Sequence, residues 1–176
     1  MAIHKMFFAG LGGQGIMLMG QMVGSAAIHE DKESTFFPSY GPEMRGGTAN
    51  CTVIVSDKAI SNPVISESDC VVAMTLPSLL KFEPTLKPGG TLFVNTSMIH
   101  QKPKRDDITV YEIPVSDMAN DMGNPRIANM IMLGAFVRVT KIVRAEDVEE
   151  VIRDFFGTKG SELVELNLKA FNHWQK

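Results

Sequence analysis

Only two cysteines, Cys51 and Cys70, occur in this sequence of 176 residues, and no C-x-x-C pair is present. An iron–sulfur cluster held by this chain alone would need more thiolates, so such a cluster is excluded. Each cysteine lies in an apolar run typical of a strand, which predicts buried structural thiols rather than catalytic or redox groups. The four histidines are scattered without the spacing of metal ligands, so we predict no metal site.

An excess of positive charge is also missing. Lys and Arg number 17 against 20 Asp and Glu, a net charge of −3, so nucleic-acid binding has no electrostatic support. No basic cluster points to a membrane surface. The apolar stretch at residues 6–28 is broken by glycines and glutamines, which favours buried core over a membrane span or a secretion signal. We therefore expect a cytoplasmic protein, and the length predicts a single domain over residues 1–176.

What the sequence does contain is a glycine loop, GLGGQG at residues 10–15, between an apolar run that predicts a strand (residues 6–9) and a segment that predicts a helix (residues 16–28). The spacing G-x-G-x-x-G is provided by Gly10, Gly12 and Gly15. In this position the motif allows a tight turn, and the N–H groups at the helix start can bind an anion such as phosphate. The alternative, a turn without a ligand, has equal weight for this motif taken alone.

A second glycine segment, PSYGPEMRGG at residues 38–47, predicts a loop with special backbone angles, since it holds three glycines and two prolines. Arg45 is the only cation between Lys32 and Lys58, and its guanidinium could bind a phosphate or a carboxylate through two hydrogen bonds. The alternative is that Arg45 only pairs with Glu43 in a structured connection.

The short apolar run at residues 35–37 is expected to stop at Pro38. A dinucleotide-binding domain would usually place an acidic residue at the end of its second strand, where it binds the ribose hydroxyls. The run here ends in Phe36-Phe37-Pro38 without an acid, which argues against NAD.

Strands and helices alternate along the rest of the chain. Strands are predicted at residues 48–56, 69–74, 91–95 and 108–113, and helices at residues 77–86, 125–143, 145–156 and 161–174. This pattern predicts an α/β fold, a three-layer Rossmann-like sandwich with a mostly parallel sheet and helices on both faces. The strand at residues 48–56 follows no helix, which allows it to run antiparallel. Ligands in such folds bind at the carboxyl ends of the strands, where both glycine segments are expected to meet.

The two glycine segments together indicate a family. GLGGQG after a first strand, followed by PSYGPEMRGG running into TANCTVIVSD, resembles the gamma subunit of 2-oxoacid:ferredoxin oxidoreductases. The later stretches DCVVAM and GNPRIANMIMLGAF also match that family, so the resemblance covers nearly the whole chain. The length resembles the stand-alone subunit of a 2-oxoglutarate or branched-chain 2-oxoacid enzyme.

The resemblance implies a non-self-sufficient subunit of an enzyme that oxidatively decarboxylates a 2-oxoacid to an acyl-CoA, with electrons passing to ferredoxin. It implies partner alpha, beta and delta subunits, with thiamine diphosphate on alpha and beta and iron–sulfur clusters on beta and delta. Coenzyme A (CoA) is the candidate ligand of this chain, and a homodimer is an option for the isolated chain. No catalytic residue is assigned.

The candidate contacts, carried over from the resemblance, are Gly10, Gly12, Gly13, Gln14, Gly15, Tyr40, Glu43, Arg45, Gly46 and Gly47. Which of them contact CoA and which contact other subunits stays open. Two other functions are weighed: a free-standing NAD(P)-binding oxidoreductase and a purely structural scaffold subunit. The missing acid and the absence of a His–carboxylate or Ser–Tyr–Lys arrangement argue against the first.

Overall fold

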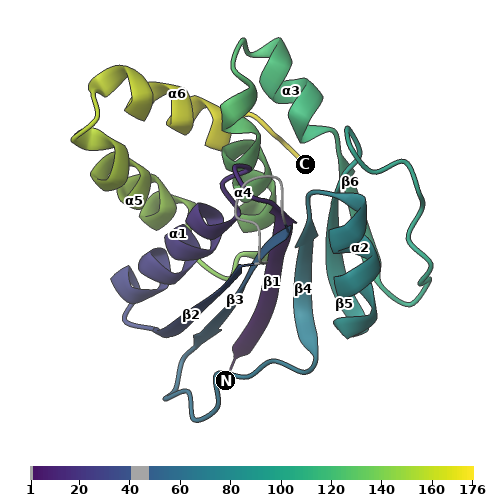
Figure 1. The fold of residues 1–176 in the computed structure, drawn as a ribbon. Helices are drawn as coiled ribbons and strands as arrows, with labels where there is room; N and C mark the ends of the chain where they lie inside the picture. Colours follow the sequence, from purple (N-terminus) through teal and green to yellow (C-terminus); the bar gives the residue numbers. More distant parts are fainter. Residues whose placement is uncertain (1, 41–47) are drawn as a thin grey trace.

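The computed structural model describes residues 2–40 and 48–176 of the chain. The elements follow in the order β1 (Ile3–Leu11), α1 (Ile16–His29), β2 (Glu33–Tyr40), β3 (Thr48–Ser56), β4 (Ser68–Ala73), α2 (Leu76–Phe82), the 3-10 turn η1 (Glu83–Thr85), β5 (Leu86–Asn95), β6 (Thr109–Ile113), α3 (Val115–Asp121), the 3-10 turn η2 (Pro125–Ile127), α4 (Ala128–Thr140), α5 (Ala145–Gly157) and α6 (Ser161–Phe171) (Figure 1).

The described strands form one six-stranded sheet in the order β2-β3-β1-β4-β5-β6. Strands β1, β4, β5 and β6 are parallel to their neighbours in this series. Strand β3 is antiparallel to both β1 and β2, as its lack of a preceding helix allowed. The predicted α/β fold with a mostly parallel sheet is therefore confirmed.

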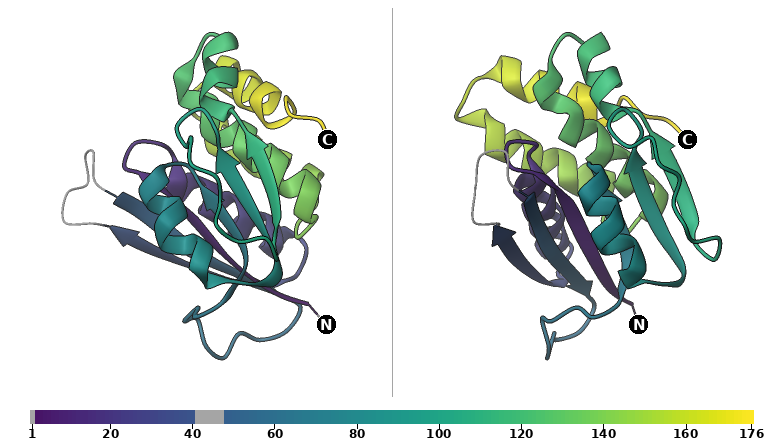
Figure 2. Two further views of the ribbon diagram at one scale, coloured as in Figure 1. Left: turned by 90° about the vertical axis from the view of Figure 1, so that its right-hand side faces the viewer. Right: turned by 45° about the vertical axis from the view of Figure 1, so that its right-hand side comes forward.

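Helices cover both faces of the sheet because successive strand residues point to opposite sides (Figure 2). Met6 and Phe8 of β1 enter a large core shared with α1, α4, α5 and α6, whereas Phe7 and Ala9 enter a smaller core under α2. In the large core, Phe136 of α4 packs against Phe8, with ring centroids 5.2 Å apart. Helix α4 is thus the centre of this layer, which explains why its middle carries no charge.

Helix α1 lies close to β2 and β3 because two of its glycines leave room for the sheet. A Cβ at Gly20 would come within 2.5 Å of Cys51 Sγ on β3, and a Cβ at Gly24 would meet Ser34 Oγ at 3.0 Å. Glycine at these two positions therefore allows the close packing of α1 on the sheet.

Some predicted boundaries are wrong. Strand β2 continues through Pro38, which pairs in register with Cys51. Pro38 is tolerated because β2 is the outermost strand of the described sheet and has a neighbour on one side only. The helix predicted at residues 77–86 ends at Phe82, and the strand predicted at residues 91–95 begins earlier, at Leu86. Residues 87–90 thus lie within β5, where Gly89 has φ +80° and the register with β4 shifts. Among the described residues, no helix combines the length and apolar character needed to cross a bilayer.

Candidate functional site

The glycine loop lies at a point where the chain connections change side. Strands β1 and β4 are parallel neighbours, yet α1 after β1 packs in the large core and α2 after β4 packs in the small one. Ligands of open α/β sheets bind at such a switch point, outside the carboxyl ends of the strands. The fold therefore places residues 10–15 where a ligand is expected.

Gln14 stabilises the glycine loop through hydrogen bonds within the loop. Its side-chain Oε1 accepts a hydrogen bond from the backbone N–H of Leu11 at 2.7 Å, and its own backbone N–H donates to the Leu11 carbonyl at 3.2 Å. A Cβ at Gly10 would lie 2.5 Å from Gln14 Oε1 and 2.7 Å from Ile16 Cδ1. Gly10 and Gln14 thus have a structural role in shaping the turn, whether or not a ligand is bound.

Gly13 and Gly15 differ in what surrounds them, although both have positive φ, +91° and +73°. A Cβ at Gly15 would collide with the side-chain amide of Asn129, whose Nδ2 also donates to the Gly15 carbonyl at 3.4 Å. A Cβ at Gly13 would meet no atom of residues 2–40 or 48–176 within 4 Å. Gly15 is therefore needed for the contact between α1 and α4, whereas the backbone at Gly13 is open to a ligand.

The start of α1 is not capped by the described part of the protein. Gly15 is the N-cap residue and offers no side chain, and the first turn contains no acidic residue. The first N–H groups of a helix have no acceptor within the helix, and here the N–H of Met19 is bonded to the Gly15 carbonyl at 3.2 Å. The preceding N–H groups, together with the positive end of the helix dipole, can bind an anion.

Two cavities flank the loop. The larger, of about 460 Å³, is called here the apolar cavity, and no described residue of its lining is charged. It is lined by Leu11, Gly12, Gly13, Gly15, Ile16, Met17, Leu18, Gln21, Thr48, Ala49 and Phe155. The smaller, of about 160 Å³, is called the Arg126 cleft. It is lined by Gly13, Gln14, Met74, Ser116, Pro125, Arg126, Ala128 and Asn129. Gly13 lines both.

The structure brings only part of the predicted site together. The five candidates in the glycine loop lie side by side, and four of them line one or both cavities: Gly12, Gly13, Gln14 and Gly15. The backbone of Tyr40 ends β2 opposite Ala49, and Thr48 pairs with Leu11 at the start of β3. Candidates Glu43, Arg45, Gly46 and Gly47 lie outside the described residues. The meeting of the two glycine segments stays a prediction.

Three residues of this region were not predicted from the sequence: Asn129 behind Gly15, Phe155 in the apolar cavity, and Arg126 in the smaller cleft. Each is more than 100 positions from the glycine loop, in a segment that the sequence identified only as helical. Their positions in the sequence do not indicate that they lie near the glycine loop, because only the packing of α4 and α5 against α1 brings them there.

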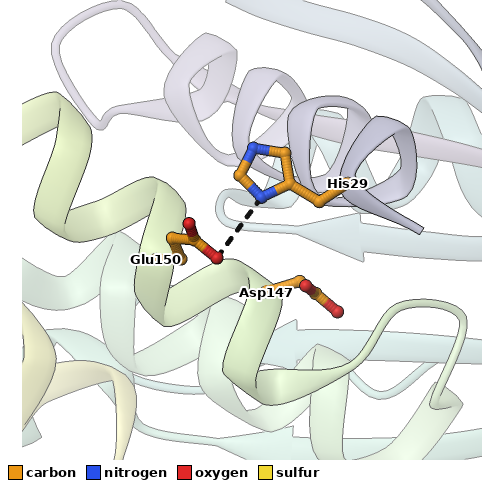
Figure 3. A group of neighbouring side chains, drawn as sticks. All are labelled: His29, Asp147 and Glu150. Carbon is orange, nitrogen blue, oxygen red and sulfur yellow. Dashed lines mark ion pairs between the residues drawn. The ribbon is translucent and has the colours of Figure 1, made fainter. Parts of the chain in front are cut away.

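A group of His29, Asp147 and Glu150 joins α1 to α5 (Figure 3). One potential ligand atom from each lies within 4.8 Å of the others, a set that could hold a metal ion. However, Arg144 Nε lies 2.6 Å from Asp147 Oδ2, and His29 Nδ1 lies 3.7 Å from Glu150 Oε2. We interpret the group as one contact between α1 and α5, from His29 to Glu150, which is an ion pair when His29 is protonated, beside an ion pair at the start of α5, from Arg144 to Asp147. The absence of a metal site stays a prediction.

Comparison with known proteins agrees with this geometry. A family model described as pyruvate ferredoxin/flavodoxin oxidoreductase matches residues 5–173. The 2-oxoglutarate synthase subunit KorC of Methanocaldococcus jannaschii is 38% identical over 167 residues, which cover 93% of this chain and 88% of the relative. The crystal structure of a keto/oxoacid ferredoxin oxidoreductase gamma subunit from Geobacter sulfurreducens superposes with a TM-score of 0.80 at 32% identity, covering 96% of this chain and 94% of that one.

A larger protein contains the same fold as one part. The 2-oxoglutarate:ferredoxin oxidoreductase of Magnetococcus marinus, solved with 2-oxoglutarate, coenzyme A and succinyl-CoA bound, matches with a TM-score of 0.91 at 26% identity. The match covers 98% of this chain but 30% of that chain. With the family model spanning almost the whole sequence, the chain belongs to the pyruvate ferredoxin/flavodoxin oxidoreductase family and is a subunit of the gamma type.

Proposed function

We propose that this gamma-type subunit supports the CoA-dependent oxidative decarboxylation of a 2-oxoacid, in which CO2 leaves, the acyl group is joined to CoA and the electrons pass to ferredoxin. Its own part is to bind CoA at the glycine loop and to contact partner subunits. The observation that carries this proposal is the uncapped start of α1, which lies at the switch point and beside a cavity of about 460 Å³.

The chemistry of the site suits CoA, which combines phosphoryl groups with a long, less polar arm and an adenine ring. The N–H groups at the start of α1 are donors for phosphoryl oxygens. Met17, Leu18 and Phe155 give the apolar cavity walls that an adenine or a pantetheine chain can pack against. The relative from Magnetococcus marinus, solved with coenzyme A bound, supports this choice of ligand.

The remaining chemistry is assigned to partner subunits. The chain has only two cysteines, both buried, so its residues do not fit an iron–sulfur cluster. Nothing in its sequence points to a thiamine site. We therefore assign thiamine diphosphate and the clusters to alpha, beta and delta partners, with ferredoxin as the acceptor of the complex. On its own the chain is expected to have no catalytic activity.

The substrate is proposed to be 2-oxoglutarate or a branched-chain 2-oxoacid. The names of the relatives from Methanocaldococcus and Magnetococcus support 2-oxoglutarate. Substrate selection is expected to lie with the thiamine-bearing partners, so the residues of this chain do not decide it.

No observation favours a free-standing NAD(P)-dependent oxidoreductase. Strand β2, which follows α1, pairs with β3 at the sheet edge, whereas the second strand of a nucleotide-binding domain would pair with β1.

The experiment that tests the proposal uses Arg45, which the sequence places in the second glycine segment. Arg45→Ala is made in the enzyme assembled with its partner subunits, and the Michaelis constant for CoA and subunit co-purification are measured. If Arg45 holds a CoA phosphate, the constant should rise about tenfold to hundredfold, as expected for a charge-assisted hydrogen bond of roughly 1.5–3 kcal/mol. Arg153→Ala, on the exposed side of α5, is the matched control.

The outcomes separate the alternatives. A higher constant with intact assembly supports CoA contact, and failed assembly supports a role of the second glycine segment at a subunit interface. An unchanged constant with normal assembly would make this segment a structural connection. If the gamma subunit of the wild-type enzyme does not bind CoA although the complex assembles normally, the chain is better explained as a purely structural scaffold.

A further inference from the structure

The Arg126 cleft shares Gly13 with the apolar cavity, and its other described lining residues differ from those of that cavity. Its walls come from the glycine loop, from Met74 just beyond β4, from Ser116 at the start of α3, and from the residues that begin α4. Both β1 and β4 end here, so the cleft occupies the switch point between the two parallel strands. Its volume of about 160 Å³ equals that of roughly five waters, which is enough for a phosphoryl group.

Among the residues that the structure describes, Arg126 is the only charged one that lines this cleft. Its backbone N–H is held by Asn124 Oδ1 at 2.9 Å, which fixes the chain at η2. Its side chain is exposed and makes no hydrogen bond or ion pair with any residue in the described ranges 2–40 and 48–176. By contrast, the guanidinium groups of Arg105 and Arg144 each pair with an aspartate at 2.6 Å. Arg126 therefore offers a positive charge that the described chain does not neutralise.

The polar side chains around Arg126 have their acceptor atoms occupied. Gln14 Oε1 accepts from the Leu11 N–H at 2.7 Å, and Asn129 Oδ1 accepts from the Met130 N–H at 2.9 Å. The Ser116 Oγ accepts a hydrogen bond from the fully buried Asn95 Nδ2 at 3.0 Å, which leaves the Ser116 hydroxyl proton to donate elsewhere. The amide nitrogens of Gln14 and Asn129 each donate one hydrogen bond, to Met98 Sδ at 3.3 Å and to the Gly15 carbonyl at 3.4 Å, and each has a second proton left to donate. Because the acceptors are used and some protons remain available beside a cation, the site suits an anion rather than a cation.

We propose that the Arg126 cleft is an anion subsite, which takes a phosphoryl group of a ligand that reaches it across Gly13 from the apolar cavity. Gly13 lines both cavities, and no atom of the described chain lies within 4 Å of the position that a Cβ would take there. A ligand with an apolar part and several phosphoryl groups could thus occupy both cavities. The inference rests on the proposed function for the identity of that ligand as CoA, and inorganic pyrophosphate tests the subsite separately.

The test is a calorimetric titration of the full chain with pyrophosphate and, separately, with CoA. Arg126→Ala should weaken binding about tenfold or more, the loss expected when a charge-assisted hydrogen bond is removed. Arg126→Lys should lose less, because lysine keeps the charge but not the planar fork of donors. The control is Arg153→Ala, since Arg153 is also exposed but pairs with Glu149 on α5, and it should bind both ligands as the wild type does. Thermal melts of each variant check the fold.

The subsite is overturned if Arg126→Ala changes the affinity for neither ligand, or if Arg126→Ala and Arg153→Ala weaken binding equally, which would indicate only surface charge. A loss specific to Arg126 with either ligand supports it. Pyrophosphate binding that depends on Arg126, in a protein that does not bind CoA, would keep the subsite and overturn CoA as the ligand. If CoA binds equally well to the wild type and to Arg126→Ala, and pyrophosphate does not bind, the subsite is overturned and CoA is kept as the ligand.

Discussion

At the scale of single residues, the two cysteine thiols are chemically inert for a physical reason. Cys51 lies on β3 beneath α1, where its Sγ–H points to the Ile16 carbonyl at 3.7 Å, and Cys70 lies on β4. Burial raises the pKa of each thiol to about 12, and the neighbouring charge of Asp69 adds to the rise for Cys70. At neutral pH both are protonated, so neither can act as a thiolate nucleophile or metal ligand.

These raised pKa values predict lower stability at alkaline pH. Cysteines of the unfolded chain lose their protons above about pH 8.5, whereas the folded thiols keep them to about pH 12. Between these values the unfolded state binds fewer protons, so the free energy of unfolding falls as pH rises, by about 1.4 kcal/mol per pH unit for each cysteine. Urea unfolding between pH 8 and 10.5 measures this slope. The double variant Cys51→Ala, Cys70→Ala should show a shallower one, and equal slopes would contradict the prediction.

At the scale of elements, the contact between α1 and α4 depends on the absence of a side chain at Gly15. The Asn129 amide fills the space where that side chain would be, and its Nδ2 donates to the Gly15 carbonyl. The same loop contains Gly13, whose φ is also positive but where a Cβ would contact none of the described residues. Comparing substitutions at Gly13 and Gly15 therefore distinguishes the cost of backbone strain from the cost of disturbed packing.

Gly13→Ala should destabilise the protein by about 1–2 kcal/mol, the cost of placing an L-residue in the left-handed region. Gly15→Ala should cost about 1–3 kcal/mol more, because Asn129 must also be displaced. The free energy of unfolding of the two variants, measured in urea, gives the comparison. Equal losses would show that α4 moves away from the loop without cost.

The sequence predicted the elements better than their ends. Strand β3 could be located because its β-branched residues stand out between Gly47 and Asp57. The continuation of β2 through Pro38 could not be predicted, because it depends on whether a strand has one neighbour or two, which is a property of the assembled sheet. The same holds for Asn129 and Arg126, which reach the glycine loop only through helix packing.

At the scale of the whole molecule, the proposed function makes this gamma-type subunit dependent on partner chains for catalysis. We expect the purified chain to show no 2-oxoacid- and CoA-dependent reduction of a viologen dye, because the sequence holds no nucleophile–base arrangement and no cluster ligands. The enzyme assembled with its partner subunits is the positive control. Turnover by the isolated chain that approaches the turnover of the complex would overturn its assignment as a dependent subunit.

The large core joins the two ends of the chain, and this affects how the protein is made. Phe8 of β1 packs on Phe136 of α4, and Arg138 of α4 donates to the carbonyl of Phe171 at 2.8 Å in the last turn of α6. During synthesis α1 can cover part of this face early, but the side chains of β1 that pack on α4 stay exposed until α4 has left the ribosome. Contacts so distant in sequence form slowly, and an exposed sheet is prone to aggregate in the meantime. The nascent subunit is thus expected to depend on chaperones before it can meet its partners.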